Sequence, residues 1–245
     1  MIRKIRQSFR SALAVLIWAF IALDTLIVFL LIAFLKPFDR HGELSYRIAN
    51  FWGKSIIRIN PLWHITFSGL NHIKKKTAYV LVANHASLAD IVCLYCLGKH
   101  FKWVAKSSLF KIPVFGWTMS LLGYIPLKRG KHGSIRDSFR EAQACLEKGV
   151  SVLIFPEGTR SRTGALGEFK NGAFKLALLT RKPIVPIVIQ GTGAVLSKGK
   201  AQPAASVEGS LKVLPPIDTG RYKDGDYDLL KTEVRDLMSR ELDRS

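Results

Sequence analysis

The feature that most constrains this chain is a long apolar run near its amino terminus. From Ser11 to Leu35 the sequence is almost continuously apolar, and Asp24 is its only charged residue. About 25 helical residues, each rising about 1.5 Å, reach roughly 37 Å, whereas the hydrocarbon core of a bilayer is about 30 Å thick. The run ends at Lys36 and Pro37, without the small-residue cleavage site of a signal peptide. The sequence therefore predicts a helix long enough to cross a membrane.

Basic residues lie on both sides of this run, with Arg6 and Arg10 before it and Lys36 and Arg40 after it. Positive residues favour the cytoplasmic side of a membrane, so both ends of the run are expected on that side. A hairpin that enters one leaflet and returns satisfies this expectation, and a single tilted span is the other arrangement that stays open. The predicted location is the inner or cytoplasmic membrane, with the domain that follows these residues facing the cytoplasm.

A second helix is predicted after the apolar run. Its apolar residues recur at helical spacing, and its basic residues Arg47, Lys54 and Arg58 lie on another face, as in helices at a membrane interface. The apolar residues are Leu44, Ile48, Phe51, Trp52, Ile56 and Ile59. Ordinary packing against a globular domain is the alternative for this helix. We expect residues 1–60 to form the membrane-anchoring helices.

Beyond Asn60 and Pro61, short β-rich runs alternate with helical ones, which indicates an α/β fold with a largely parallel sheet. The predicted strands are Trp63–Phe67, Tyr79–Ala83, Lys102–Ala105, Tyr124–Leu127, Val152–Phe155, Ile184–Ile189 and Val207–Val213. The predicted helices are Leu88–Leu97, Val114–Leu122, Ile135–Glu147, Ala173–Thr180 and Tyr227–Leu242. Ser134 and Asp137 are predicted to cap the third helix. We expect one mostly parallel-sheet α/β domain over residues 61–245, attached to the two-helix segment.

The chain is strongly basic. Its 37 Lys and Arg residues against 18 Asp and Glu give a formal net charge of +19, which favours anionic lipid, phosphorylated substrates or nucleic acid as partners. Nucleic acid is not expected, because no recognised binding-fold signature and no run of alternating basic and aromatic residues occur. The G-x-S-x-G motif of serine hydrolases is also missing from the sequence.

Three cysteines, Cys93, Cys96 and Cys145, are too few for a disulfide framework in 245 residues. Cys93 and Cys96 form one C-x-x-C, but a zinc site needs four ligands, and neither a second pair nor a suitably spaced His pair accompanies it. We expect the thiols to be structural, no metal to be bound, and the domain to lie in a reducing compartment.

Residues with catalytic chemistry follow the strand Tyr79–Ala83. His85 comes just after the carboxyl end of the strand, where α/β sheets commonly bind ligands, and Asp90 follows five residues later. If Ser87 caps the next helix, the Asp90 carboxylate turns back over the first turn and reaches the imidazole. The carboxylate would then orient one ring nitrogen and leave the other as a general base. An ordinary capping box beside a structural histidine is the alternative.

Two further strand ends carry residues suited to an anion. After the strand that ends at Phe155, Gly158 lets the backbone approach a ligand, and Arg160 offers a planar fork that suits a phosphate. Lys128 and Arg129 follow another predicted strand. Solvated loops are the alternative for both segments when each is considered alone.

In combination, these segments resemble the glycerolipid acyltransferases typified by 1-acyl-sn-glycerol-3-phosphate acyltransferase. The H-x₄-D motif of that family is matched by His85 and Asp90, and its F-P-E-G-T-R-S motif by residues 155–161. Its weaker second block is matched by Gly123–Arg129, and its fourth block, an apolar strand with an internal proline, by Val185–Gln190. The four blocks occur in the order and spacing of the family.

The resemblance implies a site as well as a fold. His85 would deprotonate the acceptor hydroxyl, and Asp90 would orient His85. The implied substrate-binding residues are Lys128, Arg129, Glu157, Gly158, Thr159 and Arg160. The cations among them would lie near a phosphate of the acceptor. The donor would be a coenzyme A or acyl-carrier-protein thioester, used as a co-substrate, and no cofactor is implied.

The implied reaction transfers a fatty acyl group to the sn-2 hydroxyl of 1-acyl-sn-glycerol 3-phosphate (lysophosphatidic acid), which forms phosphatidic acid in phospholipid biosynthesis. The second block has Pro126, Leu127 and Lys128 before Arg129, a departure from its commoner versions. Other acceptors therefore stay open, namely glycerol 3-phosphate, another lysophospholipid or a lyso-aminolipid. The expected partners are the lipid bilayer, lysophosphatidic acid and the acyl donor.

Overall fold

A seven-stranded sheet forms the centre of the protein, seen here in a computed structural model that describes residues 2–161, 163–194 and 206–244. The strand order is β1-β7-β6-β2-β5-β3-β4, and every neighbouring pair is parallel except β6 and β7. The strands are β1 (Trp63–Ser68), β2 (Val80–Ala83), β3 (Phe101–Lys106), β4 (Ile125–Leu127), β5 (Ser151–Ile154), β6 (Ile184–Gln190) and β7 (Val207–Val213). The predicted mostly parallel α/β sheet is confirmed.

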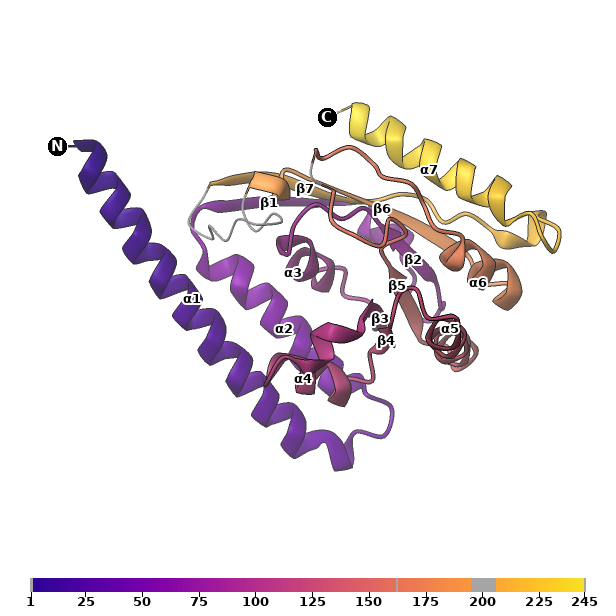
Figure 1. The fold of residues 1–245 in the computed structure, drawn as a ribbon, viewed down its shortest axis with the longest axis horizontal. Coiled ribbons are helices and arrows are strands. Elements are labelled where there is room, and N and C mark those ends of the chain that lie inside the picture. Colours follow the sequence, from indigo (N-terminus) through magenta and orange to yellow (C-terminus); the bar gives the residue numbers. More distant parts are fainter. Residues whose placement is uncertain (1, 162, 195–205, 245) are drawn as a thin grey trace.

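Helices cover both faces of this sheet, which gives three layers (Figure 1). One face packs against α1 (Ile2–Leu35), α2 (Glu43–Ile59), α3 (Ala89–Tyr95) and α4 (Phe115–Leu121). The other packs against α5 (His132–Glu147), α6 (Gly172–Thr180) and α7 (Tyr227–Asp243). Short 3-10 helices lie in the connections: η1 (Lys36–Phe38), η2 (Leu70–His72), η3 (Ser107–Lys111), η4 (Thr192–Ala194) and η5 (Thr219–Arg221).

The central strands are apolar on both faces, as strands covered by helices on both sides must be. Every residue of β2 is buried; Leu81 and Ala83 join the core on the α1 to α4 side, while Val80 and Val82 join the core on the opposite side. Because β2 pairs in parallel with β5 and β6, the segments that follow these three strands meet at one edge of the sheet. This edge holds the candidate functional site.

The helix α5 begins earlier than predicted. It starts at His132, so the predicted capping by Ser134 and Asp137 is wrong. Gly130, with φ +78°, turns the chain soon after β4 and lets the helix begin sooner. Ser134 instead lies in the first turn, where its hydroxyl accepts a hydrogen bond from the Lys128 backbone N–H at 3.0 Å.

The first two helices pack against each other as a hairpin (Figure 1). Asp39 fixes the start of α2, because its carboxylate accepts the backbone N–H groups of Leu44 at 3.3 Å and Ser45 at 2.7 Å. Asp24, the charged residue inside the apolar run, accepts a hydrogen bond from the Ser55 hydroxyl at 2.5 Å. These hydrogen bonds join polar groups within the hairpin.

The helix α2 also packs closely against the domain that follows it. Tyr46, Ala49 and Ile56 are buried, and a Cβ added at Gly53 would lie 2.6 Å from the Cβ of Tyr95 in α3. Ordinary packing, the alternative that the sequence left open for this helix, is confirmed for this face. As a result, α2 shares a hydrophobic core with the sheet.

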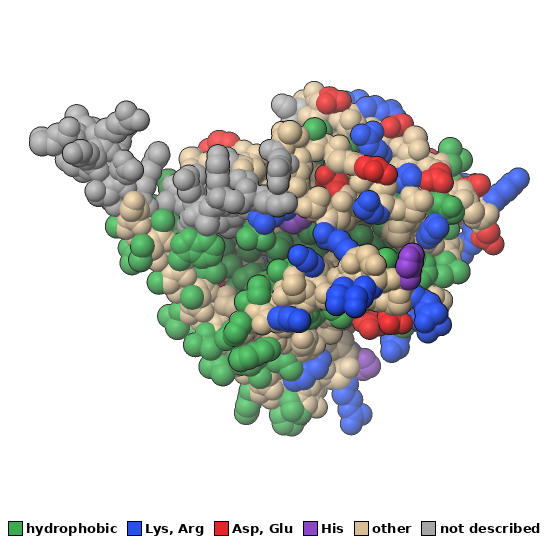
Figure 2. All heavy atoms as spheres, viewed as in Figure 1, with side chains coloured by type: hydrophobic (Ala, Val, Ile, Leu, Met, Phe, Trp, Pro, Cys, Tyr) green, Lys and Arg blue, Asp and Glu red, His purple; other side chains and the backbone are tan. Residues whose placement is uncertain are grey.

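An exposed apolar surface covers the outer side of α1 and continues onto α2 and α4, at the lower left of Figure 2. Large exposed members are Val15, Leu16, Leu23, Ile27, Leu30, Phe34, Phe38, Phe51 and Trp117. Of the described helices, α1 alone is long and apolar enough to span a membrane, with a mean hydropathy of 2.8 in its best window. A continuous apolar surface of this kind suits contact with lipid.

Candidate functional site

The segment between β2 and α3 brings a histidine and a carboxylate into contact. Nδ1 of His85 lies 2.8 Å from Oδ2 of Asp90, and Asp90 is fully buried. The same oxygen accepts the backbone N–H groups of Ala86 at 2.8 Å and Ser87 at 2.9 Å. The Ser87 hydroxyl accepts the N–H of Ala89 at 3.1 Å, where the helix begins. The predicted turn of Asp90 back onto His85 is confirmed, but α3 begins at Ala89 with Leu88 at its N-cap, so the predicted position of Ser87 at the N-cap is wrong.

These contacts assign the roles of the two nitrogens of His85. A carboxylate only accepts hydrogen bonds, so in the neutral imidazole Nδ1 is the nitrogen that donates to Asp90 and Nε2 is the nitrogen with the lone pair. The imidazole also stacks on Phe155, with ring centroids 4.0 Å apart and an interplanar angle of 11°. Because both contacts hold the ring in one orientation, Nε2 is suited to accept a proton.

Glu157 supports this arrangement through the backbone. Its Oε1 accepts the N–H of His85 at 3.0 Å, and its Oε2 accepts the N–H of Gly167 at 2.8 Å. Burial raises the pKa of the Glu157 carboxyl, an effect that these two hydrogen bonds oppose. The Ser161 N–H donates to the His85 carbonyl at 2.7 Å. The segment after β5 therefore binds both the backbone N–H and the backbone carbonyl of His85.

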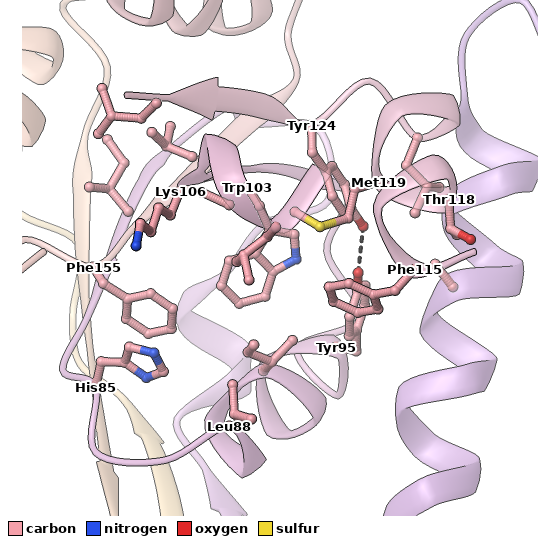
Figure 3. A pocket seen from close by; sticks show the side chains of 18 of the residues that line it. His85, Leu88, Tyr95, Trp103, Lys106, Phe115, Thr118, Met119, Tyr124 and Phe155 are labelled. Atoms are coloured by element: carbon pink, nitrogen blue, oxygen red, sulfur yellow. Dashed lines mark hydrogen bonds between the residues drawn. The ribbon is translucent and has the colours of Figure 1, made fainter. Parts of the chain in front are cut away.

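An apolar cavity of about 370 Å³ opens beside His85, between the sheet and helices α1 to α4. Figure 3 shows His85, Phe155 and Lys106 on one side of this cavity, Phe115 of α4 on the other, and Trp103 between them. Most of the lining is aromatic or aliphatic, so the cavity suits a hydrocarbon ligand that reaches the imidazole.

The amino-terminal helices contribute part of the cavity wall. Thr25 and Val28 of α1 and Trp52 of α2 line it. Two tyrosines of the lining, Tyr95 and Tyr124, satisfy their hydroxyls by a hydrogen bond of 2.6 Å to each other (Figure 3). Because the hairpin supplies lining residues, removing it would open the cavity to its surroundings.

Cationic side chains also line the cavity near His85. Arg129 and Arg160, both predicted from the sequence, lie in the lining. Gly158 has φ +71°, and a Cβ added there would lie 3.8 Å from the Arg129 guanidinium carbon, so the two segments approach closely. Thr159 lines the cavity as well.

The other two predicted substrate-binding residues lie elsewhere. Among the described residues that line the cavity, neither Lys128 nor Glu157 occurs. The Lys128 side chain is exposed, whereas the Glu157 carboxylate faces backbone N–H groups as described above.

Two residues of the site were not predicted from the sequence. Lys106 is the last residue of β3 and lines the cavity. Its position at the carboxyl end of a strand, the feature that pointed to His85, could have pointed to Lys106 as well. Thr192 follows β6, and its hydroxyl donates to Oδ1 of Asp90 at 2.5 Å. A single threonine after a strand has no distinctive pattern, so only the packing of the strands shows this contact.

The described residues offer no group of three or more His, Cys, Asp or Glu side chains that could hold a metal ion. All three cysteines are free thiols. Burial raises the pKa of the Cys93, Cys96 and Cys145 thiols, which disfavours their nucleophilic thiolate forms.

Residues 64–190, just over half of the chain, match a family model described as acyltransferase. Over 178 residues the chain is 42% identical to "1-acyl-sn-glycerol-3-phosphate acyltransferase LPAT1, chloroplastic" of Arabidopsis thaliana, an alignment that covers 71% of this chain and 49% of that protein. It is 35% identical over 172 residues to "1-acyl-sn-glycerol-3-phosphate acyltransferase alpha" of Ovis aries, covering 69% and 60%. The chain thus spans about half the length of the plant relative.

A solved structure resembles the whole chain. It is the crystal structure of the 1-acyl-sn-glycerophosphate (LPA) acyltransferase PlsC from Thermotoga maritima, with a TM-score of 0.80 and 26% sequence identity. The similarity covers 97% of this chain and 96% of that one, so it includes the amino-terminal hairpin as well as the sheet.

Proposed function

Because the chain belongs to the acyltransferase family, we propose that it transfers a fatty acyl group from a thioester to the sn-2 hydroxyl of 1-acyl-sn-glycerol 3-phosphate. The observation that carries this proposal is the His85–Asp90 pair at an apolar cavity that Arg129 and Arg160 also line. The reaction needs a base, a place for an acyl chain and cations for a phosphate, and the same edge of the sheet supplies all three.

In the proposed reaction His85 is the general base. As the acceptor oxygen attacks the thioester carbonyl carbon, its proton passes to Nε2, and Asp90 stabilises the resulting imidazolium through Nδ1. The tetrahedral intermediate then expels the thiolate of the donor, which takes up the proton from Nε2. The products are phosphatidic acid and a free thiol, and no acyl group is attached to the protein at any step.

The acyl chain of the donor fits the cavity, since its thioester carbon must lie beside His85. Side chains such as Trp103, Phe115 and Met119 would surround the chain. Each methylene removed from water contributes about 0.8 kcal/mol, so a long acyl chain supplies substantial binding free energy. Either coenzyme A or acyl carrier protein is a chemically suitable carrier for this thioester.

The phosphate of the acceptor would lie near Arg129, Arg160 and Lys106. A phosphate monoester carries close to two negative charges at neutral pH, and a guanidinium fork binds it through charge-assisted hydrogen bonds. Lysophosphatidylcholine carries a phosphodiester with a bulky cation attached, so it should be a poor acceptor. This charge preference favours lysophosphatidic acid among lysolipids.

The exposed apolar surface of α1, α2 and α4 would hold the enzyme at the bilayer that contains its lysolipid acceptor. Basic residues on both sides of the apolar run support a hairpin whose ends both face the cytoplasm. The proposed location is therefore the inner or cytoplasmic membrane, with the sheet on the cytoplasmic side.

Acyl transfer by the purified chain tests this function. Lysophosphatidic acid, lysophosphatidylcholine and glycerol 3-phosphate are compared as acceptors, with an acyl-coenzyme A and an acyl-carrier-protein donor in separate assays. We expect kcat/KM for lysophosphatidic acid to exceed that for either other acceptor by at least about tenfold, as one charge-assisted hydrogen bond would produce. A preference for lysophosphatidylcholine would reject the acceptor, and no transfer in any combination would reject the activity.

A further inference from the structure

We propose that Thr192 is a positioning residue for the catalytic pair, holding the Asp90 carboxylate so that it keeps the His85 ring aligned. The inference rests on the proposed function and adds a residue that the resemblance did not assign. The Thr192 hydroxyl donates to Oδ1 of Asp90 at 2.5 Å, and both residues have 0% exposure. The hydrogen bond is therefore shielded from water.

The two oxygens of Asp90 have different partners. Oδ2 accepts hydrogen bonds from Nδ1 of His85 and from two backbone N–H groups, whereas Oδ1 accepts from Thr192. An Asp side chain rotates over a broad range about its last torsion, so contacts to one oxygen alone leave the carboxylate plane free to tilt. Thr192 fixes the second oxygen and with it the direction in which Oδ2 meets the imidazole.

The fold determines where Thr192 lies. Parallel pairing of β6 with β2 brings the ends of both strands together, and Asn84 joins them by two hydrogen bonds of 2.8 Å to the backbone of Ile189. Gly191 then turns the chain with φ +76°, where a Cβ would lie 2.1 Å from the Glu208 carbonyl oxygen. Only glycine fits there, and its turn directs Thr192 toward Asp90.

Replacing Thr192 by the isosteric Val removes the hydroxyl while keeping the shape. We expect Thr192→Val to lower kcat by about ten- to a hundredfold, the effect of losing a hydrogen bond to a charged group, and to change the KM of either substrate by less than about threefold. Thr192→Ser keeps the hydroxyl, so it should retain kcat within about threefold of wild type.

Thr219 offers a matched control. It also begins a 3-10 helix and has 0% exposure, and within the described part of the chain its hydroxyl oxygen has no hydrogen-bond partner. Thr219→Val should therefore leave kcat unchanged. If Thr219→Val lowers kcat as much as Thr192→Val does, the loss reflects a general effect on the core, and the proposal is overturned.

A double-mutant cycle tests whether Thr192 acts through Asp90. In an Asp90→Asn background the orienting charge is already lost, so adding Thr192→Val should lower kcat by no more than about twofold. Equal losses in both backgrounds would show that Thr192 acts independently of Asp90 and would contradict the proposal.

A chemical measurement gives an answer that does not depend on acyl transfer. Diethyl pyrocarbonate acylates an imidazole nitrogen that keeps its lone pair, and mass spectrometry follows His85 separately from His132, which is exposed and serves as the internal reference. We expect Thr192→Val to slow modification of His85 severalfold relative to His132. If Thr192→Val slows the modification of His85 but the wild-type protein shows no acyl transfer, the proposed function is rejected and the inference about Thr192 is kept.

Wild-type kcat and wild-type His85 modification in a folded Thr192→Val protein would overturn the inference while leaving the proposed function in place. Circular dichroism and thermal melting establish that the variants are folded. If the Val variant fails to fold, Thr192→Ala takes its place with the same expected losses, and Thr192→Ser must still retain kcat. A large loss of kcat in a folded Thr192→Ser protein would overturn the inference as well.

Discussion

At the scale of single residues, the proposed mechanism depends on His85, whose surroundings leave one ring nitrogen available. The Asp90 carboxylate occupies Nδ1 of His85, the Phe155 ring covers one face of the imidazole, and Glu157 holds its backbone N–H. Each of these contacts restrains a different degree of freedom. The remaining nitrogen, Nε2, is therefore the atom at which proton transfer should occur.

Removing either member of the catalytic pair should stop transfer without unfolding the protein. His85→Ala deletes the base, so we expect kcat to fall by about 10²–10⁴-fold or more. Asp90→Asn keeps the shape but removes the charge that stabilises the imidazolium, so severe impairment is expected. Steady-state kinetics on variants with wild-type circular dichroism measure both effects. Near-normal turnover by a folded His85→Ala protein would rule out the mechanism.

A substitution of Glu157 distinguishes two possible roles of this residue, which are to hold the backbone at His85 and to contact the acceptor. In Glu157→Gln an N–H group replaces one accepting oxygen, so either His85 or Gly167 loses the acceptor for its backbone N–H. We expect kcat to fall by about ten- to a hundredfold with little change in the acceptor KM. The opposite pattern, a raised acceptor KM at unchanged kcat, would indicate direct contact between Glu157 and the acceptor.

The cysteines should be dispensable for chemistry. Cys93 is fully buried, and burial raises the pKa of all three thiols, so none is activated as a nucleophile. The variant with Cys93, Cys96 and Cys145 all replaced by Ala should keep wild-type kcat, with a loss of stability of about 1 kcal/mol per buried site. Trapping a labelled acyl group on one of these cysteines, together with loss of activity in the variant, would be incompatible with direct transfer.

At the scale of helices and strands, the site forms because the parallel strands β2, β3, β4, β5 and β6 end at the same edge of the sheet. The predicted strands before His85, Lys128 and Glu157 all have counterparts, since buried strands produce short apolar runs that the sequence displays directly. The contacts of Thr192 were not predictable in this way, because they depend on which strands become neighbours. The pairing of β6 with β2 joins residues about a hundred positions apart.

The surroundings of the amino-terminal hairpin were also not predictable from sequence patterns alone. Helical periodicity predicted α2, but it could not distinguish packing from lipid contact, because both need apolar side chains. In the structure one face of α2 packs on α3, while Phe51 on another face is 66% exposed. The same helix therefore contributes to the core and to the exposed apolar surface.

The orientation of this hairpin is directly measurable. If the amino terminus and the sheet both lie on the cytoplasmic side, as their positive charges favour, a reporter fused before residue 1 should be labelled only after cells are permeabilised. A reporter at residue 245 serves as the control for the cytoplasmic side. Labelling of the amino-terminal reporter from outside intact cells would instead establish a single span.

At the scale of the whole molecule, the cavity lies between the sheet and the helices α1 to α4. Its lining comes from the hairpin as well as from the sheet, so both segments shape the cavity. The charges at the site are consistent with the strongly basic sequence, but only the three-dimensional arrangement shows which cations line the cavity. Arg129 and Arg160 do, whereas the neighbouring Lys128 does not.

The most direct test of the account is whether these two arginines serve the acceptor. We predict that Arg129→Ala and Arg160→Ala each raise the KM for lysophosphatidic acid by about ten- to a hundredfold at fixed donor, with little change in the donor KM. Arg136→Ala, which removes an exposed cation of α5, is the matched control and should leave both constants unchanged. If the arginine variants instead lose affinity for the donor and keep that for lysophosphatidic acid, recognition of the acceptor phosphate at this site is contradicted.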